Sequence, residues 1–204
     1  WAMSGGWGLY TQAPPALNGT PALPFPAQVF GTDGNRVHPY PGAEKETSSA
    51  TSPPGVLPAQ LQFLSWNWDE LNALGLEDVH TDIHCVTRWS KLGTDWRGVS
   101  LDKLFEDAET SFDFVMVHSY GGYTTNLPLE DLMNGQAWIA TEFGGEPLEP
   151  DHGGPARLLV PHLYFWKSAK WVRGITMQRT DSPGFWERNG RDFHGETWSE
   201  ERYW

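Results

Sequence analysis

The sequence predicts an α+β fold built around one core, and three observations lead to this class. The length of 204 residues and a hydrophobic content of 39% suit one sizeable domain. Strand-like and helix-like stretches are mixed along the chain without the regular βαβ order of a doubly wound sheet. No internal repeat is visible in the sequence.

The chain divides into two parts of different composition. Residues 1–60 are rich in proline and lack a sustained period of 2 or 3.6, which predicts an irregular N-terminal arm with one short strand around residues 28–30. A partly disordered leader is the alternative interpretation of this part. Residues 61–204 have globular patterning and are predicted to form the functional domain.

Short helices are expected over residues 67–74, 100–105 and 128–135. Asn67 with Glu70 three residues later is a capping-box pattern at the start of the first helix. Ser100 is a good cap for the second helix. Pro128 suits the first turn of the third helix, and Gly135 is typical of a helix end.

Strands are expected over residues 79–85, 112–119, 137–143, 156–160 and 171–178. In the first of these, apolar Val79 and Ile83 alternate with polar His80 and Asp82, and the strand ends near Cys85.

Charge and composition exclude several kinds of partner. A net charge of −12 disfavours nucleic acid and anionic membrane surfaces. The apolar runs are too short to span a bilayer, and a single cysteine cannot form an internal disulfide. We expect a cytoplasmic protein, although the chain begins Trp-Ala-Met and an exported form stays open.

Cys85 is the first candidate for chemistry. It is the only cysteine, it ends a predicted strand, and Arg88 and Lys91 follow it closely. Nearby cations stabilise a thiolate, which is a soft metal ligand. An inert buried cysteine is the alternative.

A second candidate is the stretch from His152 to Thr180, which contains no Asp or Glu. Its cations are Arg157, Lys167, Lys170, Arg173 and Arg179. Because these cations are interleaved with apolar residues, they are expected to face a cleft, where a phosphate would be the natural occupant. A basic surface strip paired with acidic neighbours is the alternative. Glycine turns at Gly153-Gly154 and Gly121-Gly122 allow backbone to approach a bulky ligand.

Four segments together resemble a known family. They read HCVTRWSKLGTDWRGVSL from His84, HSYGGYTTNLPLEDL from His118, HGGPARLLVPHLYFWKSAKWVRG from His152 and PGFWERNG from Pro183. They are similar to the molybdopterin domain of sulfite oxidase, in particular to the small bacterial sulfite oxidase-like oxidoreductases, over about residues 61–204. The resemblance implies mixed sheets and short helices around a buried molybdenum–molybdopterin cofactor.

The resemblance also implies residue roles. Cys85 matches the cysteine that binds molybdenum. The residues expected to contact the cofactor are Cys85, Ser119, His152, Arg157, Lys167, Ser168, Ala169 and Lys170. His84, His118 and Tyr120 flank matched positions and are candidates for proton transfer or substrate contact, with a structural role as the alternative.

The implied activity is oxygen-atom transfer on a small sulfur or nitrogen compound, with electrons exchanged with a separate protein partner. Sulfite oxidases place an arginine soon after the cysteine to hold sulfite, whereas this chain has Trp89-Ser90-Lys91 there. Arg88 or Lys91 is the candidate replacement, and sulfite, a sulfoxide or another S- or N-oxide stays open as substrate.

Other classes of function remain as alternatives. A zinc or copper enzyme would use His80 and His84, but on a strand these side chains lie roughly 13 Å apart. A Trp-rich carbohydrate-binding module would leave Cys85 and the acid-free stretch unexplained. A non-catalytic or cofactor-less relative of the same fold is the remaining alternative.

Overall fold

The computed structural model describes residues 27–30, 64–108 and 110–203. They form two five-stranded sheets. The first sheet has the order β2 (Leu64–Trp66), β1 (Ala27–Phe30), β10 (Val172–Gln178), β5 (Phe114–Ser119) and β6 (Thr124–Pro128). The second runs β3 (Glu77–Cys85), β4 (Trp89–Ser100), β7 (Trp138–Phe143) and β8 (Glu146–Pro147), with β9 (Arg157–Leu159) also paired to β7. The first sheet is mixed because β1 and β10 are parallel, while all other pairs in both sheets are antiparallel.

The helices are short. They are α1 (Trp68–Ala73), α2 (Leu101–Leu104) and α3 (Phe185–Arg188), with 3₁₀ turns η2 (Tyr120–Gly122), η3 (Leu129–Leu132) and η4 (Pro150–His152). Mixed sheets joined by short helices are therefore confirmed, although strands contribute more of the described chain than the name α+β suggests.

Local patterns predicted the helix starts well. Asn67 accepts a hydrogen bond from the Glu70 amide at 2.9 Å, and the Glu70 carboxylate accepts one from the Asn67 amide at 2.7 Å, so the capping box is confirmed. Ser100 caps α2 as expected. The third predicted helix is only the 3₁₀ turn η3, because Pro128 still belongs to β6 and the turn ends before Gly135.

All five strands predicted within residues 79–178 are present with bounds shifted by a few residues. The predicted strand at 28–30 corresponds to β1, and the rest of the predicted arm lies outside the described residues. The longest strand, β4, was not predicted. The alternation of polar and apolar residues along β4 is interrupted near Gly93, which has a positive φ. There the register of the pairing with β3 shifts, between Thr81 and Ile83 of β3.

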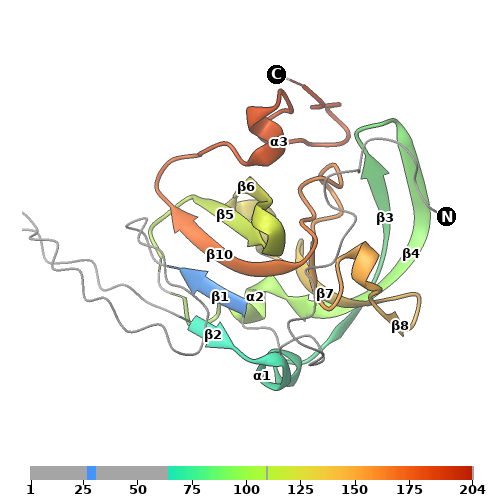
Figure 1. Cartoon of the computed structure of the whole chain (residues 1–204), viewed down its shortest axis with the longest axis vertical. Coiled ribbons are helices and arrows are strands. Elements are labelled where there is room, and N and C mark those ends of the chain that lie inside the picture. Colours follow the sequence, from blue (N-terminus) through green and yellow to red (C-terminus); the bar gives the residue numbers. More distant parts are fainter. Residues whose placement is uncertain (1–26, 31–63, 109, 204) are drawn as a thin grey trace, which may run out of the picture.

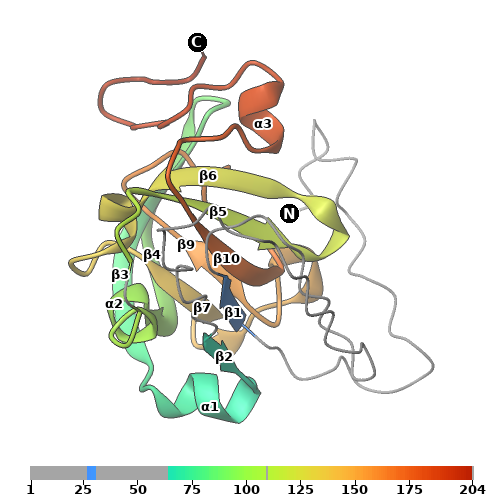
Figure 2. The ribbon, with the colours of Figure 1, turned by 90° about the vertical axis from the view of Figure 1, so that its left-hand side faces the viewer.

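The main core lies between the two sheets. Buried side chains from each sheet meet there, for example Val115 and Ile175 from the first and Val99, Ile139 and Leu158 from the second. The chain after β10, including α3, crosses the end of the molecule above β6 and beside the free end of the β3–β4 hairpin (Figures 1 and 2). This C-terminal stretch therefore lies close to the position of Cys85.

Candidate functional site

Cys85 is the last residue of β3, at the start of the turn into β4. The turn is closed by a hydrogen bond of 3.0 Å from the Arg88 amide to the Cys85 carbonyl, with Arg88 in the left-handed conformation. The thiol is a free cysteine, 4% exposed, and its sulfur lies 3.0 Å from the Thr87 hydroxyl. A strand end and a tight turn thus hold a single sulfur in one place.

Arg157 is a buried guanidinium, 3% exposed. It donates to the carbonyls of His152 at 2.9 Å and Ser168 at 2.8 Å, while its Nε has no partner among the described residues. Burial lowers the pKa of Arg157 to about 9. No carboxylate of the described residues lies within ion-pair distance of it, so a buried charge is present without a protein counter-ion.

Lys170 lies beside Arg157. A Cβ on Gly153, whose φ is +105°, would approach the Cβ atoms of Lys170 and Arg157 to 3.0 and 3.1 Å, so this glycine lets the turn pass closely over both cations. Burial, and then the charge of Arg157, lower the pKa of Lys170 to about 8. We call Arg157, Ser168 and Lys170 the Arg157 cluster.

The segment at Ser168 and Ala169 is held against β9. The Ser168 hydroxyl accepts a hydrogen bond from the Val160 amide at 2.9 Å, and the Ala169 carbonyl accepts one from the Leu158 amide at 2.8 Å. Its position therefore depends on β9, the strand that begins with Arg157.

Phe165 connects the Arg157 cluster to the strand that ends in Cys85. Its amide donates to the His84 carbonyl at 2.8 Å, and its ring lies 4.3 Å from the Arg157 guanidinium. Trp96 adds a second ring, 5.6 Å from the same guanidinium. The acid-free stretch and the cysteine, far apart in sequence, are thus joined through one residue.

The end of β5 brings His118, Ser119 and Tyr120 to the same region. The Tyr120 amide donates to the carbonyl of Trp171 at 2.9 Å, and Ser119 is paired in register with Val172. Ser119 is buried, and its hydroxyl has no hydrogen-bond partner among the described residues. Burial, with the nearby charge of Arg173, lowers the pKa of His118 to about 4. Its Nε2 lies 3.0 Å from the Thr176 hydroxyl.

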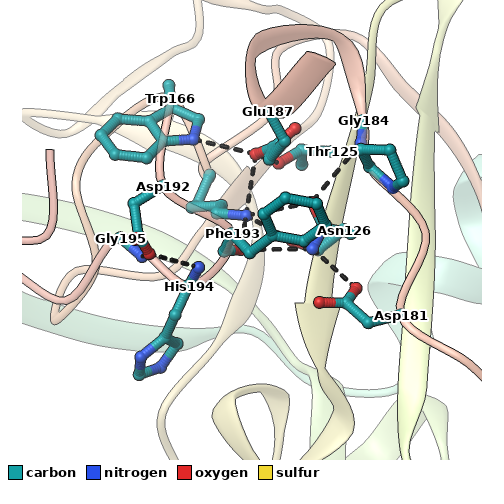
Figure 3. Close-up of polar contacts among 12 residues, drawn as sticks. Thr125, Asn126, Trp166, Asp181, Gly184, Glu187, Asp192, Phe193, His194 and Gly195 are labelled. Atoms are coloured by element: carbon teal, nitrogen blue, oxygen red, sulfur yellow. Dashed lines mark hydrogen bonds and ion pairs between the residues drawn. The ribbon is translucent and has the colours of Figure 1, made fainter. Parts of the chain in front are cut away.

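Two of the predicted cofactor residues point elsewhere. The His152 side chain is 62% exposed and lies 3.6 Å from Glu149, so only its backbone carbonyl contacts the Arg157 cluster. Lys167 is fully buried, and its ammonium lies 2.8 Å from the Glu187 carboxylate of α3. Figure 3 shows Glu187 between Trp166 and Thr125, both of which donate to it. The structure therefore lends no support to a phosphate contact at the Lys167 side chain.

His84 faces a different surface from the Cys85 sulfur. Its ring bonds the Ser90 hydroxyl at 2.7 Å and meets Trp198 edge-on at 5.5 Å. A cavity of about 360 Å³ lies there; its lining residues are Thr81, Asp82, His84, Gly135, Gln136, Trp138, Pro161, His162 and Trp198.

Sequence reasoning missed a histidine–carboxylate cluster next to this cavity. Asp131 bonds His162 at 3.0 Å and His194 at 3.1 Å, and His194 also lies 3.0 Å from Glu201. Burial raises the pKa of Asp131, but the hydrogen bonds from the two histidines outweigh it and lower that pKa to about 2. These residues come from three distant segments, so no local pattern could have indicated them.

The described residues contain neither a ready-made metal site of His, Cys, Asp and Glu nor a membrane-spanning helix. Among them, no group of three or more His, Cys, Asp or Glu is arranged to hold a metal ion. His80, a candidate for a zinc or copper site, lies on β3 as the sequence predicted. Its ring bonds the Asp95 carboxylate at 2.6 Å and belongs to no such group. No helix in the described part of the chain is long and apolar enough to cross a membrane.

Comparison with known proteins gives a consistent picture. Residues 60–186 match the model of the oxidoreductase molybdopterin binding domain family. The uncharacterized oxidoreductase YuiH of Bacillus subtilis is 43% identical over 139 residues, which are 67% of this chain and 70% of that protein. Human mitochondrial sulfite oxidase is 35% identical over 75 residues, 36% of this chain and 13% of that protein.

Among solved structures, the sulfane dehydrogenase SoxCD from Paracoccus pantotrophus is similar with a TM-score of 0.53 and 20% identity. The match covers 63% of this chain and 38% of that chain, and it shows a likeness of fold. The chain thus spans most of the length of YuiH but only a small part of sulfite oxidase.

Proposed function

Because the chain belongs to the oxidoreductase molybdopterin binding domain family, we propose that it is a molybdenum-dependent enzyme that transfers an oxygen atom on a small sulfur- or nitrogen-containing substrate. Sulfite and sulfoxides are the substrate types that the resemblance suggests, and a separate redox protein exchanges electrons with the enzyme.

The observation that carries the proposal is a pair of buried polar atoms that have no hydrogen-bond partner in the described part of the chain. The Ser119 hydroxyl and the Arg157 Nε are both buried, and both belong to residues assigned to the cofactor from sequence. Buried polar groups are nearly always hydrogen-bonded, so such exceptions indicate a missing partner. A pterin with a phosphate group offers acceptors for both, and the residues present therefore fit the cofactor.

Each chain residue has a role in this proposal. Cys85 holds the metal through its sulfur, and Thr87 limits the rotation of that sulfur through the contact at 3.0 Å. Arg157 and Lys170 neutralise the phosphate, and the backbone of Ser168 and Ala169 lies along the cofactor. Bound there, the molybdenum–molybdopterin group supplies two-electron oxygen-atom transfer, and the protein supplies placement, charge and exclusion of water.

The candidate proton-transfer residues differ in what their surroundings allow. His118, with a pKa of about 4, is neutral near pH 7, so one ring nitrogen can donate a hydrogen bond and the other can accept one, but it cannot act as a general acid at that pH. His84 precedes the metal ligand, but its ring contacts Ser90 and Trp198 on a different surface from the Cys85 sulfur. Tyr120 follows Ser119 in a turn tied to Trp171. We assign Tyr120 to the substrate side, His118 to the support of the cofactor segment and His84 to a structural role.

The test is chemical analysis of the full chain produced in a molybdenum-sufficient host. We expect close to one molybdenum per chain, a fluorescent pterin after oxidation, and turnover of sulfite or an S-oxide with an artificial redox dye. A protein with neither molybdenum nor pterin would instead support the cofactor-less binding module.

A further inference from the structure

The buried ammonium of Lys167 is surrounded by acceptors. Its Nζ lies 2.8 Å from a carboxylate oxygen of Glu187, and both side chains are 0% exposed. It also donates to the Asn126 carbonyl at 2.8 Å, the Asn126 side-chain oxygen at 3.2 Å and the Phe193 carbonyl. Since an ammonium has three protons, none is left for a further ligand.

This ammonium joins three parts of the chain. Asn126 belongs to β6, Glu187 belongs to α3, and Phe193 lies in the stretch that follows α3. The Asn126 amide reinforces the junction by donating to Asp181 at 2.7 Å and to the Phe193 carbonyl at 3.2 Å (Figure 3). We call these contacts the Lys167 network.

The network borders the Arg157 cluster on one side. Lys167 directly precedes Ser168, whose carbonyl accepts from the Arg157 guanidinium at 2.8 Å. Lys167 is therefore adjacent in sequence to the residue whose carbonyl holds the guanidinium. On its other side the network fastens the C-terminal stretch, whose Arg202 donates to the Val86 carbonyl, in the turn after Cys85, at 2.8 Å.

Stability alone does not account for this arrangement. A buried ion pair pays a large desolvation cost, and an apolar pair of similar volume often gives equal or greater stability. The ammonium of Lys167 instead contacts three segments that meet beside the site.

We propose that Lys167 and Glu187 form a positioning pair that aligns the Ser168–Lys170 segment for the cofactor's phosphate and couples it to the docked C-terminal stretch. This inference rests on the proposed function. The pair touches neither cofactor nor substrate; it acts through Ser168 on Arg157 and through Phe193 on the C-terminal stretch.

The deciding variant is the double substitution K167M/E187M in the full chain. Removing both charges leaves no uncompensated ion, so the protein produced without molybdenum is expected to remain folded. It should melt below the wild type, because Trp166, Thr125, Asn126 and Phe193 each lose a hydrogen-bond partner. Molybdenum per chain and pterin fluorescence are expected to fall about tenfold, the effect typical of residues that orient ligands of a metal site. Hydrogen exchange of the backbone at residues 166–170 is expected to increase.

Single variants give an independent measurement. E187Q keeps the shape of the side chain and removes the carboxylate, and K167R keeps the charge but cannot place three protons on the same acceptors. Both are expected to lose molybdenum. The matched control is K103M, because Lys103 and Glu77 form a Lys–Glu pair of 2.7 Å that is partly exposed and lies outside the site; this variant should retain wild-type molybdenum.

The possible outcomes separate the two proposals. If K167M/E187M folds and contains wild-type molybdenum, the pair is only structural and the inference is wrong. Wild-type molybdenum in E187Q and K167R would also overturn it. If the wild-type chain itself contains neither molybdenum nor pterin, the proposed function fails first.

Discussion

The acid-free stretch contains two buried cations with opposite surroundings. Lys167 is neutralised by Glu187 at 2.8 Å, and its donors are used within the protein. Arg157, ten residues earlier, is also buried, but among the described residues it contacts two carbonyls and two aromatic rings and no carboxylate. Burying a charge is costly unless it is paired, so the guanidinium is where we propose that the cofactor's phosphate binds, whereas the ammonium holds segments of the chain together.

The largest expected effect concerns the sulfur of Cys85, the residue after His84, whose carbonyl Phe165 links to the Arg157 cluster. C85S should reduce turnover to background, because an alcohol is a poor replacement for a thiolate as a ligand to molybdenum. The fold should change little, since the serine hydroxyl can keep the contact with Thr87; we expect a loss of about 1 kcal/mol or less in the free energy of unfolding. Activity with a redox dye and urea unfolding measure both quantities.

Retained activity in C85S would remove Cys85 from the metal. It would also contradict the contrast drawn between Arg157 and Lys167, because the guanidinium of Arg157 would then need a ligand other than the proposed cofactor.

The next largest effect tests the two cations directly. R157M should lower molybdenum per chain by about tenfold or more, as loss of a supporting contact does at metal sites. Without molybdenum it should destabilise the chain less than K167M, which leaves a buried carboxylate uncompensated at a cost of about 3–5 kcal/mol. Elemental analysis and unfolding of the two cofactor-free variants test this. Equal molybdenum in R157M and wild type would contradict the assignment of the phosphate.

The third effect is a pH dependence of cofactor retention. Lys170 has a pKa of about 8 in the free protein, below its ordinary value because of burial and the charge of Arg157. A bound phosphate favours the charged amine, so binding requires a proton once the pH exceeds 8, and retention should weaken from pH 8 to 9. Molybdenum remaining after dialysis at pH 7, 8 and 9 gives the profile. The K170M variant should retain less molybdenum than the wild type at all three pH values, and its retention should not decrease further between pH 8 and 9.

The smallest effect concerns stability at acid pH. The pKa of His118 is about 4 in the folded chain, below the ordinary value of 6.5, because burial disfavours its charge. The unfolded chain therefore takes up this proton first as the pH falls, and stability declines between about pH 6.5 and 4, by about 3 kcal/mol at most. In the H118Q variant, the free energy of unfolding measured in urea should change less between these two pH values than it does in the wild type. An unchanged slope would mean that His118 is protonated at its ordinary pKa.

Several features of the fold and site could be predicted from local sequence. The capping box at Asn67 and the strand that ends at Cys85 depend on neighbouring residues, and both are present. Strand β4 could not be recognised, because pairing with β3 and β7 on both sides sustains it across the irregularity at Gly93. The cluster of Asp131 with His162 and His194 was equally invisible.

The sequence by itself determined the inventory of the site: one thiol at a strand end and a long stretch with cations but no acids. Only the tertiary structure decided which of those cations is paired with a carboxylate of the described residues. Glu187 lies twenty residues beyond Lys167 and outside the acid-free stretch, and it reaches the ammonium only because α3 folds back over β6. The physical reason is that local patterns record propensity, whereas desolvation and charge pairing depend on which distant segments exclude water together.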